Sequence, residues 1–242
     1  ACKLSFQINS LDDYSDFLPS LNQHETVQIV GAGLIGCELT HDLLHHGKKI
    51  MLISNTQWPL AELVPDPIGR ALHDYFIERG VQYVYEQQPQ FNNDLLTIFA
   101  VGLQHDTSAF KQFEQSPMGF HTNALGQTNI QDIYAIGDCA HLMGMTLRYI
   151  SPIRISAQAI AKTLTGTPTP IQLNAIPVTV KTHEYPIVSC KHPTITGQWK
   201  EETSNEPGII MMQYNEDGEK IGFSLSDKNC QLRTKIQVKP WL

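Results

Sequence analysis

Short apolar runs alternate with amphipathic stretches along the first 85 residues. Apolar runs typical of buried strands lie at 27–30, 49–54 and 81–85. Between them, apolar residues recur at helical spacing, first over 34–46 and then, after Pro65, at Ile68, Leu72, Phe76 and Ile77. Strands that alternate with helices pair in parallel, with right-handed crossovers. The pattern therefore predicts an α/β fold built on a Rossmann-type sheet.

Two further regions carry a structural pattern. Near the N-terminus, Ser10 is the expected cap of a helix that begins at Leu11 and has acidic residues in its first turn. After a linker rich in Thr and Pro at 165–170, strands are expected near 178–182, 208–214 and 221–226. The Asn-Glu-Asp-Gly sequence at 215–218 predicts a hairpin turn. The C-terminal part is therefore expected to be a small β-rich domain.

A glycine motif links the first of these strands to the helix that follows. Gly31, Gly33 and Gly36 form G-x-G-x-x-G between the apolar run 27–30 and the helical stretch 34–46. In dinucleotide-binding folds the three glycines allow a tight turn, approach of the pyrophosphate and close packing of helix on strand. The free N–H groups of the helix then face the phosphates. The alternative is a glycine-rich turn without a ligand.

The end of the second strand bears on which nucleotide would bind. An acidic residue normally holds the ribose hydroxyls of NAD at this place, but this chain has Ser54 and Asn55. Asn55 can still accept a hydrogen bond from a ribose. No arginine follows to hold a 2′-phosphate, so the sequence favours NAD weakly over NADP.

Composition indicates a folded globular protein. The 242 residues are 41% hydrophobic and 17% charged, and no apolar run approaches the length of a membrane span. The first residues lack the apolar core of a signal peptide, and the missing initiator Met suggests that the chain does not begin at its natural start.

Cysteine and histidine positions point away from disulfide and metal chemistry. The five cysteines are scattered without a C-x-x-C pair, which favours a reducing cytoplasm and argues against a dithiol redox centre. The adjacent His45 and His46 point about a quarter turn apart on a helix, so we expect an exposed helix end and no metal site.

A second informative stretch covers residues 128–140. Its apolar residues predict a strand that ends on Gly137 and Asp138, where glycine permits close backbone approach and the carboxylate can accept hydrogen bonds from a sugar-like chain. Taken alone, an aspartate after a strand is more often a turn or helix-capping residue.

Together these stretches resemble the two-dinucleotide-binding flavoprotein family of pyridine-nucleotide reductases, and within it the rubredoxin-reducing members. The resemblance covers nearly the whole chain. The nucleotide motifs specify the superfamily, whereas the segment Ile176–Thr182 points to the narrower group. The residues that carry it are Asn9–Tyr14, Gly31–Glu38, Ala100–Leu103, Ile133–Ala140 and Ile176–Thr182.

The resemblance implies roles for single residues around the nicotinamide nucleotide. Gly31, Gly33 and Gly36 would bind the pyrophosphate of NADH, with Leu34 and Ile35 beside them. Glu38, expected in the first turn of the helix, would lie near the nicotinamide and the flavin. Gly102 would pass beside the bound nucleotide. Without the resemblance, Glu38 would be interpreted as an ordinary first-turn helix acid.

The resemblance also implies roles at FAD. Asp138, preceded by Gly137, would accept a hydroxyl of the ribityl chain. The segment from Arg148 to Pro152, which includes Tyr149 and Ile150, would lie near the pyrimidine edge of the flavin. This segment would also open a helix that runs through Ala161.

Two parts of the family pattern are missing. The first FAD motif, another G-x-G-x-x-G with its surrounding domain, is absent, and only a short bridge at 86–92 replaces the usual β-meander. We interpret the chain as an excised or incompletely represented reductase; the alternative is a degenerate member. The expected parts are an FAD-domain or linker segment at 1–25, an NAD-binding domain at 26–104, the C-terminal remnant of the FAD domain at 105–166 and a C-terminal rubredoxin-reductase-type domain at 167–242.

The implied activity is transfer of electrons from NADH through FAD to rubredoxin, without a side-chain nucleophile. Ferredoxin and flavorubredoxin reductases are neighbouring alternatives, and a non-catalytic NAD-binding module is the rival from another class. Charge suggests where the acceptor docks, because residues 1–144 carry a net charge of −10 and residues 145–242 carry +3. Four basic residues near the C-terminus would attract an acidic carrier, unless they are merely solvated: Lys228, Arg233, Lys235 and Lys239.

Overall fold

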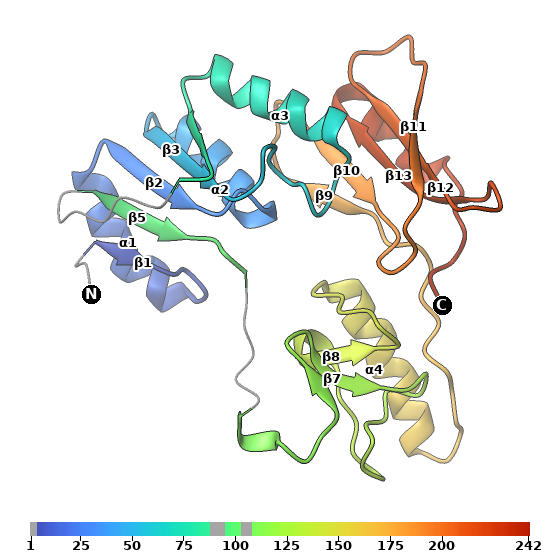
Figure 1. Ribbon diagram of the computed structural model, residues 1–242. Helices are drawn as coiled ribbons and strands as arrows, with labels where there is room; N and C mark the ends of the chain where they lie inside the picture. Colours follow the sequence, from blue (N-terminus) through green and yellow to red (C-terminus); the bar gives the residue numbers. More distant parts are fainter. Residues whose placement is uncertain (1–3, 88–94, 103–107) are drawn as a thin grey trace.

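Three β-sheets organise the part of the protein that this computed structural model describes, which is residues 4–87, 95–102 and 108–242 (Figure 1). A parallel sheet comes first, a small sheet with one long helix follows, and an antiparallel sheet forms the C-terminal part. Within these residues no helix has the length and apolar character needed to cross a bilayer.

The first sheet has the predicted Rossmann-type architecture. Its five strands are all paired in parallel, in the order β1 (Ser5–Phe6), β5 (Leu96–Phe99), β2 (Thr26–Val30), β3 (Lys49–Ser54) and β4 (Gln82–Tyr85). Helices α2 (Leu34–His45) and α3 (Asp66–Glu78) form the crossovers. The expected α/β fold is confirmed, because both helical stretches and all three apolar runs of the sequence form the predicted elements.

The segment before the expected boundary at residue 25 also lies in this sheet. Strand β1 pairs with β5, and α1 (Leu11–Gln23) contributes Phe17 and Leu21 to the same buried core as β2 and β3. A domain division at residue 25 stays a prediction, but residues 4–25 pack here with the NAD-type sheet, because Phe17 and Leu21 are buried in its core.

The N-terminus of α1 has the expected cap. The Ser10 hydroxyl accepts a hydrogen bond of 3.1 Å from the Asp13 N–H, and the Asp13 carboxylate accepts one of 2.9 Å from the Ser10 N–H. This reciprocal capping box pairs two backbone donors that the helix itself leaves free. A hydrogen bond from the Asn9 N–H to the Asp13 carboxylate, followed by the contacts of Ser10, lowers the pKa of Asp13.

We expect Ser10→Ala to lower the free energy of unfolding by about 0.5–2 kcal/mol, because the Asp13 N–H loses its acceptor. Ser15→Ala is the matched control, since Ser15 is exposed and its hydroxyl only donates to the Leu11 carbonyl. Alanine favours helix there, so stability should hold or rise slightly. Urea unfolding of both variants tests the cap, and equal midpoints would contradict it.

The middle of the chain forms a small sheet and a long helix. Strands β6 (Gln115–Ser116), β7 (Gly119–Thr122) and β8 (Ala140–Leu142) form the sheet, and α4 (Ile150–Leu164) lies beside it (Figure 1). Short 3₁₀ turns lie at η1 (Ser108–Phe110) and η2 (Gly137–Cys139). The predicted helix is confirmed and runs three residues past Ala161.

The strand expected over 128–136 does not form. The segment makes only an isolated bridge between Gln127 and Tyr134, and it turns at Ile130–Ile133. Asp132 has a φ of +62°, and the Thr128 hydroxyl bonds the local carbonyls of Ile130 and Ile133. These local contacts compete with a β-ladder, so the segment folds as turns.

The C-terminal part is an antiparallel sheet, as expected. Its order is β11 (Gln198–Glu202), β12 (Ile210–Tyr214), β13 (Lys220–Ser226), β10 (Ile187–Cys190) and β9 (Val178–Val180). The hairpin turn at 215–218 joins β12 and β13. The sequence analysis missed β10 and β11, because β10 is only four residues long and β11 is a largely polar edge strand. A 3₁₀ segment, η3 (Asp227–Thr234), follows β13.

Both faces of this sheet are buried. Ile187 and Met211 point into the core beneath the parallel sheet, whereas their neighbours Val188 and Met212 point into a second core with α4. Successive side chains of a strand face opposite ways, so one strand can serve two cores. The C-terminal sheet therefore joins the nucleotide-type sheet to the middle of the chain.

Candidate nucleotide-binding site

The glycine loop lies where β2 ends and α2 begins. The Gly31 N–H donates a hydrogen bond of 2.8 Å to the carbonyl of Ile53 on β3, and Gly31 has a φ of +109°. A Cβ at Gly31 would overlap the carbonyl of Ala100, and one at Gly36 would overlap the carbonyl of Gly31. Two of the three glycines are therefore required by the packing of the loop itself.

Gly33 differs from its neighbours, because the space beside it is open. A Cβ there would meet no atom within 4 Å, and its φ of −77° is one that any residue adopts. Gly33 is the N-cap of α2 and makes no side-chain cap, so the first N–H groups of the helix have no such acceptor. An open helix N-terminus in this position suits a phosphate group.

The other residues expected at this nucleotide lie at the same edge of the sheet. Ser54 is 4% exposed and its hydroxyl accepts from the Thr56 N–H at 3.0 Å, so it belongs to a local turn. Asn55 is exposed, which leaves it as the residue of this pair that can reach a ribose. Gly102 follows β5, has a φ of +88° and faces open space. Leu103, which the resemblance includes, lies outside the described residues.

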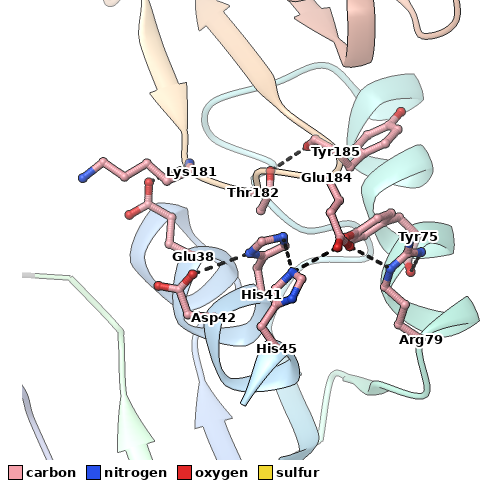
Figure 2. Close-up of polar contacts among 10 residues, drawn as sticks. All are labelled: Glu38, His41, Asp42, His45, Tyr75, Arg79, Lys181, Thr182, Glu184 and Tyr185. Atoms are coloured by element: carbon pink, nitrogen blue, oxygen red, sulfur yellow. Dashed lines mark hydrogen bonds and ion pairs between the residues drawn. The ribbon is translucent and has the colours of Figure 1, made fainter. Parts of the chain in front are cut away.

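Glu38 lies in the second turn of α2 and not in the first, because the helix begins at Leu34. Figure 2 shows it directed toward the end of β9, where its Oε1 accepts a hydrogen bond of 2.9 Å from the Lys181 N–H. This contact joins residues 143 positions apart, and no local sequence signal predicts it. A role for Glu38 near nicotinamide stays a prediction.

The residues expected at the flavin form a second group. Gly137 has a φ of +76° and opens η2, and among the described residues no group donates a hydrogen bond to the Asp138 carboxylate. Tyr149 is the N-cap of α4 without a side-chain cap, burial raises its pKa, and Ile150 is 73% exposed. A carboxylate without a donor beside an open helix N-terminus suits a ligand with hydroxyl groups and an anionic or polar edge.

The structure thus brings together two sets of the predicted residues. In the first set, Ala100 lies against Gly31 and Gly36 and leads to Gly102. In the second set, Gly137 faces Ile153 on α4. Ala100 belongs to a segment that carries the resemblance, and the structure adds that its backbone packs against the glycine loop. The four cysteines among the described residues are free, and burial raises the pKa of Cys190 to about 12 and that of Cys230 to about 11.

The chain matches two known families of protein domains. Residues 3–161 match the family described as pyridine nucleotide-disulphide oxidoreductase, and residues 170–238 match the rubredoxin binding C-terminal domain. The chain is 34% identical over 241 residues to rubredoxin-NAD(+) reductase of Acinetobacter baylyi, covering 90% of this chain and 61% of that protein. It is 29% identical to a nitric oxide reductase FlRd-NAD(+) reductase of an Enterobacter species, covering 93% and 64%.

Solved structures share the fold. NADH:rubredoxin oxidoreductase from Clostridium acetobutylicum superimposes with a TM-score of 0.76 at 21% identity, over 97% of this chain and 63% of that one. The putidaredoxin reductase–putidaredoxin complex gives 0.83 at 16% identity, over 97% and 62%. The chain therefore spans less than two thirds of the length of these relatives. On its match over residues 3–161 and its fold, the chain belongs to the pyridine nucleotide-disulphide oxidoreductase family.

Proposed function

We propose that the chain forms the NADH-binding and acceptor-binding part of an FAD-dependent NADH:rubredoxin reductase. The observation that carries the proposal is the open N-terminus of α2 at Gly33, in a chain whose C-terminal part matches a rubredoxin-binding domain. Its relatives named rubredoxin-NAD(+) reductase support the same activity. In this proposal Gly33, Leu34 and Ile35 hold the pyrophosphate, and Asn55 holds a ribose hydroxyl.

The residues at the second set fit FAD. No described residue donates a hydrogen bond to the Asp138 carboxylate, so it can accept one from a ribityl hydroxyl. The N-terminus of α4, at Tyr149 and Ile150, has no side-chain cap, so its N–H groups can donate to the polar edge of the flavin ring. Exposed apolar side chains in this region, Ile136 and Met143, offer surface for a large flat ligand. When bound, FAD would accept the two electrons of NADH and release them singly to an iron protein.

The functional test is whether the intact protein carries flavin. A yellow preparation that oxidises NADH and reduces rubredoxin supports the proposal, whereas a colourless protein that binds NADH without oxidising it would make the chain a nucleotide-binding module. Ferredoxin and flavorubredoxin are the comparison acceptors. The free cysteines agree with a cytoplasmic location, which belongs to this proposal.

The proposed docking surface for rubredoxin consists of Arg233 and Lys235, with Lys228 nearby in sequence. All three are exposed, and no carboxylate among the described residues pairs with them. Lys239, expected in the same group, differs, because its Nζ lies 2.7 Å from the Glu219 carboxylate. That pair raises the pKa of Lys239 and lowers the pKa of Glu219, so its charge is locally balanced.

We expect Arg233→Glu with Lys235→Glu to slow rubredoxin reduction at low salt by about 10-fold or more, because charge steering acts on association rate. Added salt should slow the wild type in the same way, since the Debye length is about 10 Å at 0.1 M. NADH oxidation by ferricyanide should change little.

A charge-matched control is Lys111→Glu with Lys162→Glu, two exposed residues elsewhere in the fold. It makes the same change in net charge, so it should leave most of the rubredoxin rate intact. Equal rates for the Arg233 and Lys235 variant and the wild type would place the acceptor at another surface.

A further inference from the structure

Three side chains that can bind metal converge between α2 and the C-terminal sheet. Figure 2 shows His41 and His45 on one face of α2, with Glu184 reaching them from the connection between β9 and β10. Among the described residues, these three form a group whose ligand atoms all lie within 4.8 Å of one another. The site is independent of both sets of nucleotide-site residues described above.

Two of the distances match a metal-binding geometry. His45 Nε2 lies 3.3 Å from His41 Nε2 and 3.4 Å from Glu184 Oε1. Two ligand atoms on a tetrahedral Zn²⁺, each at 2.0–2.1 Å from the ion, are separated by about 3.3–3.4 Å. The helical spacing i, i+4 places both imidazoles on one face, which the adjacent pair His45 and His46 cannot do.

The surrounding residues orient these ligands. His41 is 1% exposed, and its Nδ1 faces the Asp42 carboxylate at 3.5 Å, which leaves Nε2 directed at His45. Among the described residues the buried Nδ1 has no hydrogen-bond partner, so a closer approach of Asp42 would be needed to give the usual outer contact of a metal ligand.

The two carboxylate oxygens of Glu184 make different contacts. Its Oε2 accepts a hydrogen bond of 2.9 Å from the Tyr75 hydroxyl and lies 3.6 Å from Nε of Arg79. Its Oε1 faces His45. The carboxylate is therefore held in place through one oxygen and presents the other to His45.

We propose that His41 Nε2, His45 Nε2 and Glu184 Oε1 bind a divalent transition-metal ion such as Zn²⁺, with water in the remaining position. These side chains line a surface cavity together with Asp42, His46 and His183, which gives the ion an entry path. Two imidazoles and one carboxylate favour Zn²⁺ over Mg²⁺ and Ca²⁺, which prefer oxygen ligands. The ion would fasten α2 to the C-terminal sheet, three residues from the contact between Glu38 and Lys181.

The test is to treat the intact protein with a chelator and then titrate it with Zn²⁺, with the binding affinity measured by calorimetry. His45→Ala and Glu184→Gln should each weaken Zn²⁺ binding by at least about 10-fold, the low end of what even an outer contact contributes. Both side chains are about half exposed, at 48% and 49%, so these variants should fold. Zn²⁺ should also raise the unfolding temperature of the wild type and not that of Glu184→Gln.

His46→Ala is the matched control, because it removes an exposed histidine from the same cavity. It should keep the wild-type affinity. Co²⁺ should give the intense visible bands of tetrahedral coordination in the wild type and lose them in His45→Ala. The proposal is overturned if the wild type does not bind Zn²⁺ or if all variants bind it equally. It is also overturned if His46→Ala loses as much affinity as His45→Ala, or if Mg²⁺ gives the same response as Zn²⁺.

Discussion

Gly33→Val is expected to reduce the rate of flavin reduction by NADH at least about 100-fold, because the side chain occupies the space of the pyrophosphate. The substitution is well suited to this question, since a Cβ at Gly33 meets no protein atom within 4 Å and the backbone conformation suits any residue. Gly31 and Gly36 would not serve, because side chains there collide with the loop itself.

The measurement is stopped-flow reduction of the bound flavin in the intact protein, by NADH and separately by dithionite. Dithionite should still reduce the variant fully. Its free energy of unfolding should fall by about 0.5–2 kcal/mol, because valine is a much poorer N-cap residue than glycine. Gly33→Ala should have a smaller effect than valine. Loss of the flavin itself would mean that this loop binds the other nucleotide.

Asp138→Ala is expected to weaken FAD binding by about 1.5–3 kcal/mol, the value of a hydrogen bond to a charged group. That is roughly a 10- to 150-fold rise in the dissociation constant. Little stability should be lost, because no described residue donates a hydrogen bond to this carboxylate. Reconstitution of the flavin-free protein, followed by fluorescence quenching, gives the affinity.

Asp132→Ala is a control with the same loss of charge on the preceding loop, where Asp132 is exposed. Its φ of +62° makes some loss of stability expected, but flavin affinity should be unchanged. Flavin retention by Asp138→Ala equal to that of the wild type would remove Asp138 from the site.

Much of the parallel sheet follows from local sequence. The strands at 27–30 and 49–54 are short apolar runs, and α2 and α3 carry stripes at helical spacing. Ser10 caps α1 through neighbours three residues away, a contact that any helix beginning there can make. Periodicity and capping depend on residues within one or two turns, so a single sequence is enough to indicate them.

Two segments of the chain differ from what their composition predicts, for different reasons. The apolar stretch 128–136 has the composition of a strand, yet side-chain bonds from Thr128 and the turn at Ile130–Ile133 prevent a ladder. Strand β11 is mostly polar, and its pairing with β12 makes it a strand. In the first case local turn contacts outweigh strand composition, whereas in the second the pairing with a neighbouring strand outweighs a polar sequence.

The sequence by itself determined the glycine loop, the order of strands and helices that supports it, and the resemblance that points to two nucleotides. Only the tertiary structure decided that Gly33 alone of the three glycines faces open space, that Ser54 belongs to a local turn while Asn55 is exposed, and that Glu38 meets Lys181. It also decided that His41 and His45 meet Glu184, about 140 residues further along the chain. The reason is physical: periodicity records which face of an element is buried, whereas the partner on that face is chosen by packing between elements that are distant in sequence.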